Sequence, residues 1–146
     1  MQMPALLQAE IEKMLEGMPA QAVRAAAQSL SRRYRQGEKN PDGVNLLRSE
    51  TEIAAYAAFR MPATYAALVT ALRMAEESGC GEMRTLTDVG AGSGSAYWAV
   101  REVFGEPERA VLVEREKGMM ALGQRLGAQG EGVLWQRGDM LTAELP

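Results

Sequence analysis

The stretch Thr87-Asp88-Val89-Gly90-Ala91-Gly92-Ser93-Gly94-Ser95 decides the fold of this 146-residue chain. It overlaps a β-rich run at residues 84–89 and leads into a helical pattern over about residues 95–104. Glycine makes the sharp turn from strand to helix without strain and lets a ligand lie against bare backbone. The first turn of the following helix presents free N–H groups. The stretch therefore predicts a strand–loop–helix binding unit.

Two more strand candidates follow the glycine loop. Residues 110–113 are β-rich and end at Glu114, a helical pattern covers about 117–126, and residues 132–136 precede Gly138 and Asp139. Strands that alternate with helices form parallel sheets with right-handed crossovers. We expect an α/β fold, with a helical N-terminal region over residues 1–81 and a Rossmann-like sheet of three visible parallel strands over residues 82–146.

The N-terminal region reads as a series of amphipathic helices. Apolar residues recur at three- and four-residue spacing over about 4–16, 19–36 and two later stretches between 49 and 78. Ser49 followed by Glu52 is a capping-box pattern. Pro62 predicts a break or kink near residues 60–61, because its ring would clash with the carbonyl four residues back. Residues 37–45 are rich in turn formers and predict a loop.

Composition excludes several kinds of site. The single cysteine, Cys80, forms no intramolecular disulfide, and the absence of histidine excludes histidine-based catalysis and histidine metal ligands, so no metal site is expected. No apolar run approaches about 18 residues, so no membrane span is expected. We expect a cytoplasmic protein. The net charge of −3 gives no support for nonspecific DNA or RNA binding; the local exception is Arg32, Arg33, Arg35 and Lys39, more simply explained as a solvated helix end.

The spacing of the glycines bears on the identity of the ligand. A dinucleotide fingerprint would place its third glycine at position 95, which is Ser95. The observed Gly-x-Gly-x-Gly, preceded by Asp88, resembles the first motif of S-adenosylmethionine (SAM) dependent methyltransferases. In those enzymes the loop wraps the methionine part of SAM, and the preceding acid helps to orient it.

Two later acids extend this reading. Glu114, at the end of the second strand, can accept hydrogen bonds from both ribose hydroxyls. Asp139 follows the third strand, where such enzymes often contact the adenine amino group. Each feature has a plain alternative. Residues 90–94 form only a tight turn, Glu114 is a solvated strand end with little effect on folding, and Asp139 is a turn residue. The predicted cofactor-binding residues are Asp88, Gly90, Gly92, Gly94, Glu114 and Asp139. The sequence assigns no catalytic residue.

Several segments in order resemble one family. They are residues 30–35 (LSRRYR), 54–65 (AYAAFRMPATY within a helical pattern), the glycine loop with Trp98, and 114–123 with Met119 and Leu122. This order is similar to bacterial relatives of the mitochondrial small-ribosomal-subunit protein 22 family, a group of methyltransferase-like proteins. The segment around residues 55–65 is the most specific part, because a generic methyltransferase has no reason to carry it.

The resemblance implies a SAM-dependent methyltransferase linked to translation, whose partner is the small ribosomal subunit or its rRNA. An iron–sulfur cluster, present in several members, would need cysteines beyond this chain. Such sheets carry further strands, so we expect an incomplete sheet with an unpaired edge at residues 85–89. Two alternatives stay open: a non-catalytic ribosome assembly factor that keeps the fold, and, less favoured by the glycine spacing, a nicotinamide-dependent oxidoreductase.

Overall fold

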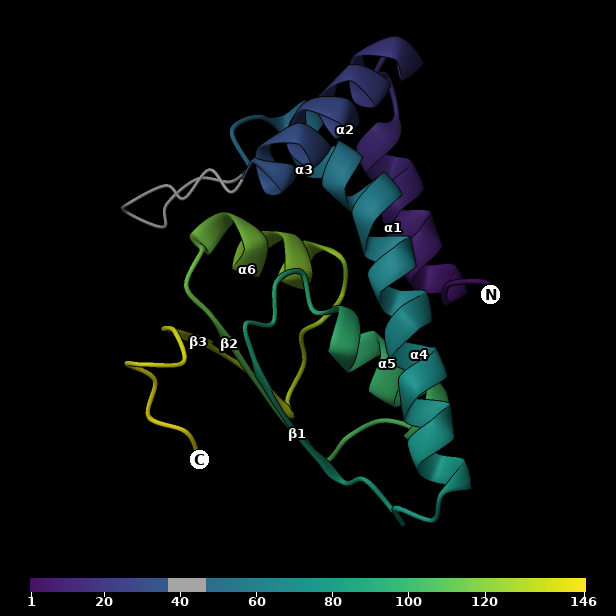
Figure 1. Ribbon diagram of the computed structural model, residues 1–146, viewed down its shortest axis with the longest axis vertical. Coiled ribbons are helices and arrows are strands. Elements are labelled where there is room, and N and C mark those ends of the chain that lie inside the picture. The colour runs from purple at the N-terminus through teal and green to yellow at the C-terminus, as the bar shows by residue number, and fades with distance from the viewer. Residues whose placement is uncertain (37–46) are drawn as a thin grey trace.

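A computed structural model describes residues 1–36 and 47–146 (Figure 1). The chain forms a helical N-terminal part and then alternates strands with helices. The loop expected at residues 37–45 lies outside the described residues. The elements are α1 (Ala5–Leu15), α2 (Ala20–Arg35), α3 (Glu50–Ala55), the π-helical turn η1 (Tyr56–Arg60), α4 (Met61–Glu77), β1 (Thr85–Val89), α5 (Ser95–Phe104), β2 (Arg109–Glu114), α6 (Lys117–Arg125) and β3 (Val133–Arg137).

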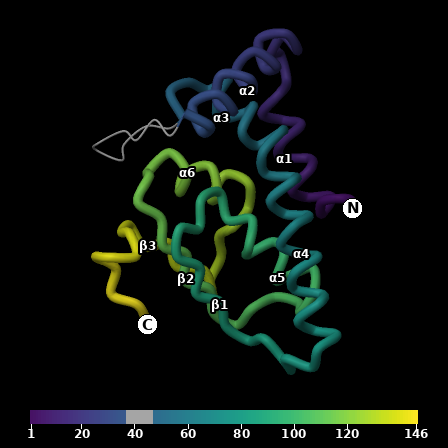
Figure 2. The backbone as a smooth tube through the Cα atoms, in the orientation of Figure 1, coloured from purple at the N-terminus to yellow at the C-terminus, as the bar shows by residue number. Residues whose placement is uncertain are grey.

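The three strands form one parallel sheet in the order β1-β2-β3, which confirms the predicted α/β fold. Figure 2 follows the chain from the end of α4 into β1, along β1 to the glycine turn, and back into α5. β2 is central, and its residues from Ala110 to Glu114 are buried. In the described part of the chain β1 pairs on one side only, as expected for residues 85–89.

The two faces of the sheet differ in their cover. Ala110 and Leu112 of β2 belong to the main core cluster, and Leu86 of β1 and Trp135 of β3 pack against that cluster. Figure 1 shows α4, α5 and α6 on one side of the sheet. On the alternate face Leu134 is 53% exposed. The helices α4, α5 and α6 therefore cover one face of the sheet (Figure 1).

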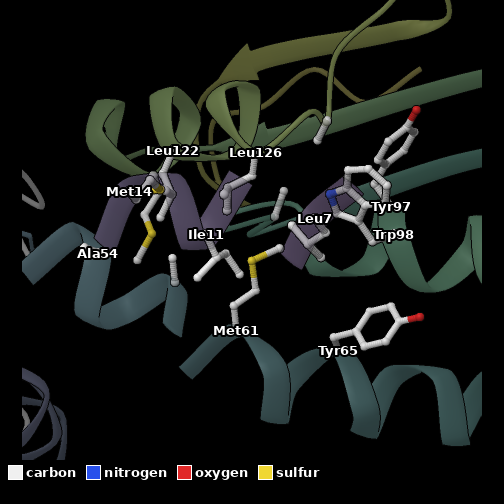
Figure 3. Packing of buried hydrophobic residues seen from close by; sticks show 14 of the residues in the cluster. Leu7, Ile11, Met14, Ala54, Met61, Tyr65, Tyr97, Trp98, Leu122 and Leu126 are labelled. Carbon is white, nitrogen blue, oxygen red and sulfur yellow. The ribbon is translucent and has the colours of Figure 1, made fainter. Parts of the chain in front are cut away.

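Helix α1 packs between the helices on that face of the sheet (Figure 3). Its buried stripe of Leu7, Ile11 and Met14 has the predicted helical spacing. Figure 3 shows this stripe between Met61 of α4 on one side and Leu122 of α6 with Leu126, which follows α6, on the other. One core cluster therefore contains residues from both sides of the expected division at residues 81 and 82, and the division itself stays a prediction.

Pro62 distorts its helix without breaking it. The chain is helical from Glu50 to Glu77, and the distortion is the five-residue π-helical turn η1 just before Met61. The Met61 N–H donates to the carbonyl of Tyr56, five residues back, in place of the usual four. This wider turn makes room for a proline ring that would clash in a regular α-helix. The prediction of a break or kink near residues 60–61 is therefore met by a local irregularity, and the helix continues through it.

The start of α3 confirms half of the capping box. The Ser49 Oγ accepts a hydrogen bond of 3.1 Å from the Glu52 N–H. The second bond of a capping box, from the Ser49 N–H to the Glu52 carboxylate, is not formed. The Glu52 carboxylate accepts instead from the Arg48 N–H at 2.7 Å and from the guanidinium of Arg33. Arg33 is only 8% exposed, so the expectation that it belongs to a solvated helix end was wrong. Its ion pair ties α2 to α3.

Candidate functional site at the glycine loop

The three glycines of the loop all have positive φ angles, of 83°, 56° and 84° for Gly90, Gly92 and Gly94. Their surroundings differ. A Cβ at Gly90 would meet nothing within 4 Å, whereas one at Gly92 would lie 3.7 Å from the hydroxyl oxygen of Tyr56. A Cβ at Gly94 would lie 3.1 Å from Cβ of Ala128. Gly90 therefore leaves open space, and Gly94 permits close packing within the core.

Backbone hydrogen bonds anchor the start of the loop to the end of β2. The N–H groups of Gly90 and Ala91 both donate to the carbonyl of Val113, at 2.8 and 2.9 Å. The Gly92 N–H donates to Oε2 of Glu114 at 2.8 Å. The loop is therefore held on the neighbouring strand before any ligand is considered.

Glu114 is a structural part of this arrangement. Its Oε1 accepts from the Glu116 N–H at 2.9 Å, while Oε2 holds the Gly92 N–H. The residue is 8% exposed. The alternative interpretation of Glu114 as a solvated strand end was wrong, because the end of this strand is covered and its carboxylate accepts two backbone N–H groups. The carboxylate keeps unused lone pairs, since two oxygens offer about four acceptor positions.

The start of α5 offers unused polar groups. Its N-cap is Gly94, which has no side chain to cap the helix. In the described chain, the N–H groups of Ser95, Ala96 and Tyr97 have no hydrogen-bond partner. The Ser93 Oγ is buried and makes no hydrogen bond of standard geometry, although the hydroxyl of Tyr56 is close enough to interact with it. Buried polar groups without partners are uncommon in folded proteins, and at a helix N-terminus they are suited to bind an anionic or polar ligand.

A cavity of about 250 Å³ lies beside the loop at the carboxyl ends of the strands. It brings together three of the predicted site residues: Gly90 after β1, Glu114 at the end of β2 and Asp139 after β3. Asp88, Gly92 and Gly94 do not line it. The carboxyl edge of a parallel sheet is the usual place for ligands in such folds. The other lining residues are Val89, Arg115, Gly138 and Met140.

Asp139 also organises the turn that follows β3. Its Oδ1 accepts from the N–H groups of Leu141 and Thr142 at 2.8 and 3.1 Å. The bond from the Leu141 N–H is the largest cause of a lowered pKa for Asp139. The turn-residue interpretation is therefore correct for one oxygen, and the residue still lines the cavity.

Asp88 lies in a less favourable environment. It is on β1 beside Leu112, in the row of residues that faces the helices. Burial raises the pKa of its carboxyl, and the negative charge of Glu114 raises it further. A partly buried carboxylate next to a like charge favours a cationic partner or a proton.

Three residues near the loop were not identified from the sequence. Trp135 of β3 donates from Nε1 to the carbonyl of Ala128 at 2.7 Å, and its ring lies against Gly123 of α6. Tyr56 of η1 lies over the loop at Gly92, and burial is the main cause of its raised pKa. A glycine inside a helix is a signal for close approach of another group, and Gly123 carried that signal.

The described residues contain neither a membrane-spanning helix nor a cluster of metal ligands. No helix in residues 1–36 and 47–146 is long and apolar enough to cross a membrane. The same residues contain no group of three or more His, Cys, Asp or Glu side chains that could hold a metal ion.

A comparison with protein families identifies one relationship. The family model described as mitochondrial small ribosomal subunit Rsm22 matches residues 50–145, which is more than half of the chain. The match begins at the start of α3 and includes η1, the glycine loop, Glu114 and Asp139. No match was found among curated proteins.

Proposed function

From the premise that the chain belongs to the mitochondrial small ribosomal subunit Rsm22 family, we propose that it binds SAM at the glycine loop and acts as a methyltransferase-like protein. The family links it to the small ribosomal subunit. One observation carries the cofactor proposal: Glu114 holds the Gly92 N–H and lines the same cavity as Gly90 and Asp139. This is the arrangement that a nucleoside at the ends of three parallel strands requires.

The residues present fit the parts of SAM. The free lone pairs of Glu114 suit a ribose diol, and the bare backbone at Gly90 leaves space beside it. The unpartnered N–H groups of α5 and the Ser93 hydroxyl suit a carboxylate, and the partly buried Asp88 suits an ammonium group. The cavity is smaller than the roughly 300 Å³ lower bound for sites that enclose drug-sized ligands. It therefore holds part of the molecule, the adenosine half.

SAM, when bound, supplies an electrophilic methyl group. The residues of this chain bind and orient it, and positioning alone supplies much of the rate in such displacements. Neither carboxylate of the cavity is assigned as a general base, because Glu114 and Asp139 each accept two backbone N–H groups. That observation favours a second candidate function, a SAM-binding assembly factor that transfers no methyl group.

Calorimetry with SAM, S-adenosylhomocysteine and NAD tests the ligand. We expect binding of the first two and not of NAD; tight NAD binding without SAM binding refutes the proposal. Gly90→Ala should weaken SAM binding, since the added methyl group enters the cavity. Gly79→Ala is a matched control, because Gly79 has the same φ of 83° and open space around it, and lies at the end of α4.

A labelling experiment separates the two candidate functions. The protein is incubated with SAM that carries a radioactive methyl group and with small ribosomal subunits that this protein has not methylated. Transfer of label to RNA or protein supports the enzyme. SAM binding without transfer supports the assembly factor.

A further inference from the structure

A second hollow lies between α2 and η1. It has a volume of about 560 Å³ and shares no lining residue with the cavity at the glycine loop. A hollow of about 410 Å³ adjoins it, and the two share Ala27, Ser31, Arg35 and Phe59. We call the continuous depression the α2–η1 groove. Its lining includes Arg24, Arg32, Tyr34 and Arg35 from α2 and Phe59 and Arg60 from η1.

The groove carries unmatched positive charge. Arg24, Arg32, Arg35 and Arg60 are exposed, and none has a carboxylate partner within residues 1–36 and 47–146. Glu52, which lies between the helices, is already bound by the buried Arg33. Four arginines without a carboxylate partner in the described residues lie along one depression, and such a surface is charge-complementary to a polyanion.

The groove also exposes two aromatic side chains. Tyr34 is 41% exposed and Phe59 is 57% exposed. The Arg60 guanidinium lies 5.3 Å from the centre of the Tyr34 ring. Aromatic rings interleaved with arginines are the surface on which unpaired nucleobases stack while their phosphates contact guanidinium groups. A polyanion without bases, such as an acidic peptide, would contact the arginines and make no stacking contact with the rings.

An ion pair connects the helices beside the groove, and the groove lies close to the glycine loop. The Arg33–Glu52 ion pair fixes α2 against α3, and the π-helical turn η1 presents Phe59 and Arg60. Tyr56 lines the groove and also lies over Gly92.

We propose that the α2–η1 groove binds a single-stranded RNA segment, with bases stacked on Phe59 and Tyr34 and phosphates on Arg32 and Arg35. The proposal rests on the proposed function in one respect, that the groove would bring RNA toward the SAM site. RNA binding in the groove does not itself require SAM.

The test measures the affinity of the full chain for a fluorescent single-stranded RNA of about 12 nucleotides. The variant Arg32→Gln/Arg35→Gln removes two charges from the groove. The control Arg84→Gln/Arg109→Gln removes two charges near the amino ends of β1 and β2. Only the groove variant should lower the slope of log affinity against log salt concentration, by about 1.4 for two lost phosphate contacts. Equal effects from both variants would overturn the proposal.

Phe59→Ala separates RNA from an acidic partner, because it changes no charge. We expect about a tenfold loss of RNA affinity and no effect on binding of polyglutamate. Stronger binding of polyglutamate than of RNA, or unchanged RNA affinity in Phe59→Ala, would overturn the proposal, and so would no RNA binding by the wild-type protein. Circular dichroism shows that each variant is folded. Calorimetry with SAM keeps the two proposals apart. A wild-type protein that binds SAM and no RNA rejects only the groove, and groove variants that lose RNA affinity while they still bind SAM support it.

Discussion

Replacing Gly123 by alanine should destabilise the protein, although alanine is the better helix former. Gly123 lies inside α6, and a Cβ there would sit 2.5 Å from two atoms of the Trp135 ring and 3.1 Å from the carbonyl oxygen of Ser93. Ordinary carbon contacts are about 3.5–4.0 Å. The ring must therefore move by about 1 Å, against its Nε1 hydrogen bond to Ala128.

The magnitude follows from two opposing effects. Alanine in place of glycine within a helix contributes about 1 kcal/mol of stability. Overpacking of a well-packed core costs about 1–3 kcal/mol, and the upper value applies because the obstacle is a pinned ring and a backbone carbonyl. The net effect is a loss of about 2 kcal/mol, which lowers the melting temperature by roughly 4–8 °C. SAM affinity should fall as well, since Ser93 belongs to the glycine loop.

Urea denaturation and thermal melting measure the change. Gly118→Ala is the matched control, because Gly118 lies in the same helix and its Cβ would meet only Oε1 of Glu116, at 3.8 Å. That variant should gain up to about 1 kcal/mol. In a Trp135→Phe background, Gly123→Ala should cost less, because the two clashing ring atoms are gone. Equal stability of Gly123→Ala and Gly118→Ala would refute the reasoning.

Three further predictions concern the loop and its acids. Glu114→Ala should lower the free energy of unfolding by about 2–4 kcal/mol in urea titrations, because two N–H groups lose a charged acceptor, and should weaken SAM binding; unchanged stability would contradict the hydrogen bonding. Asp88 has a raised folded-state pKa, so its contribution to stability is complete below the unfolded value of 3.8 and is lost as pH rises through the folded pKa. Asp88→Asn should therefore raise the melting temperature at pH 7 and not at pH 3, and should lower SAM affinity; a melting temperature below wild type at pH 7 would count against this. Gly92→Val should abolish SAM binding in calorimetry, since its φ of 56° is strained for valine and the added atoms reach toward Tyr56; retained affinity would mean that the loop is only a turn.

The local pattern of residues was sufficient for most of the fold. Glycines between a β-rich run and a helical pattern predicted β1, the loop and α5, because only glycine adopts these backbone angles freely. The helix predicted at residues 95–104 has those bounds in the structure. Pro62 was harder, since its effect depends on whether the helix can widen locally, and η1 shows that it can.

The site was predicted less completely than the fold. Gly90, Glu114 and Asp139 were placed on successive strand ends by their spacing, and the structure brings them to one cavity. The packing role of Gly94 could not be read from the sequence, because its neighbour Ala128 is brought there by the return of the chain after α6. Tyr56 was missed for the same reason, since it reaches the loop from a helix far away in the chain.

By itself, the sequence determined what depends on near neighbours: the helices, the strands, their parallel order and the glycine turn. These follow from backbone preferences and from the period of apolar residues, which act over a few positions. Only the tertiary structure decided which polar groups are buried and paired. Arg33 and Glu114 look like solvated charges in the sequence, yet each is buried because a partner from another element, Glu52 or the Gly92 N–H, meets it there. Burial and pairing depend on packing between distant segments, and that is the physical reason why a local pattern could not assign them.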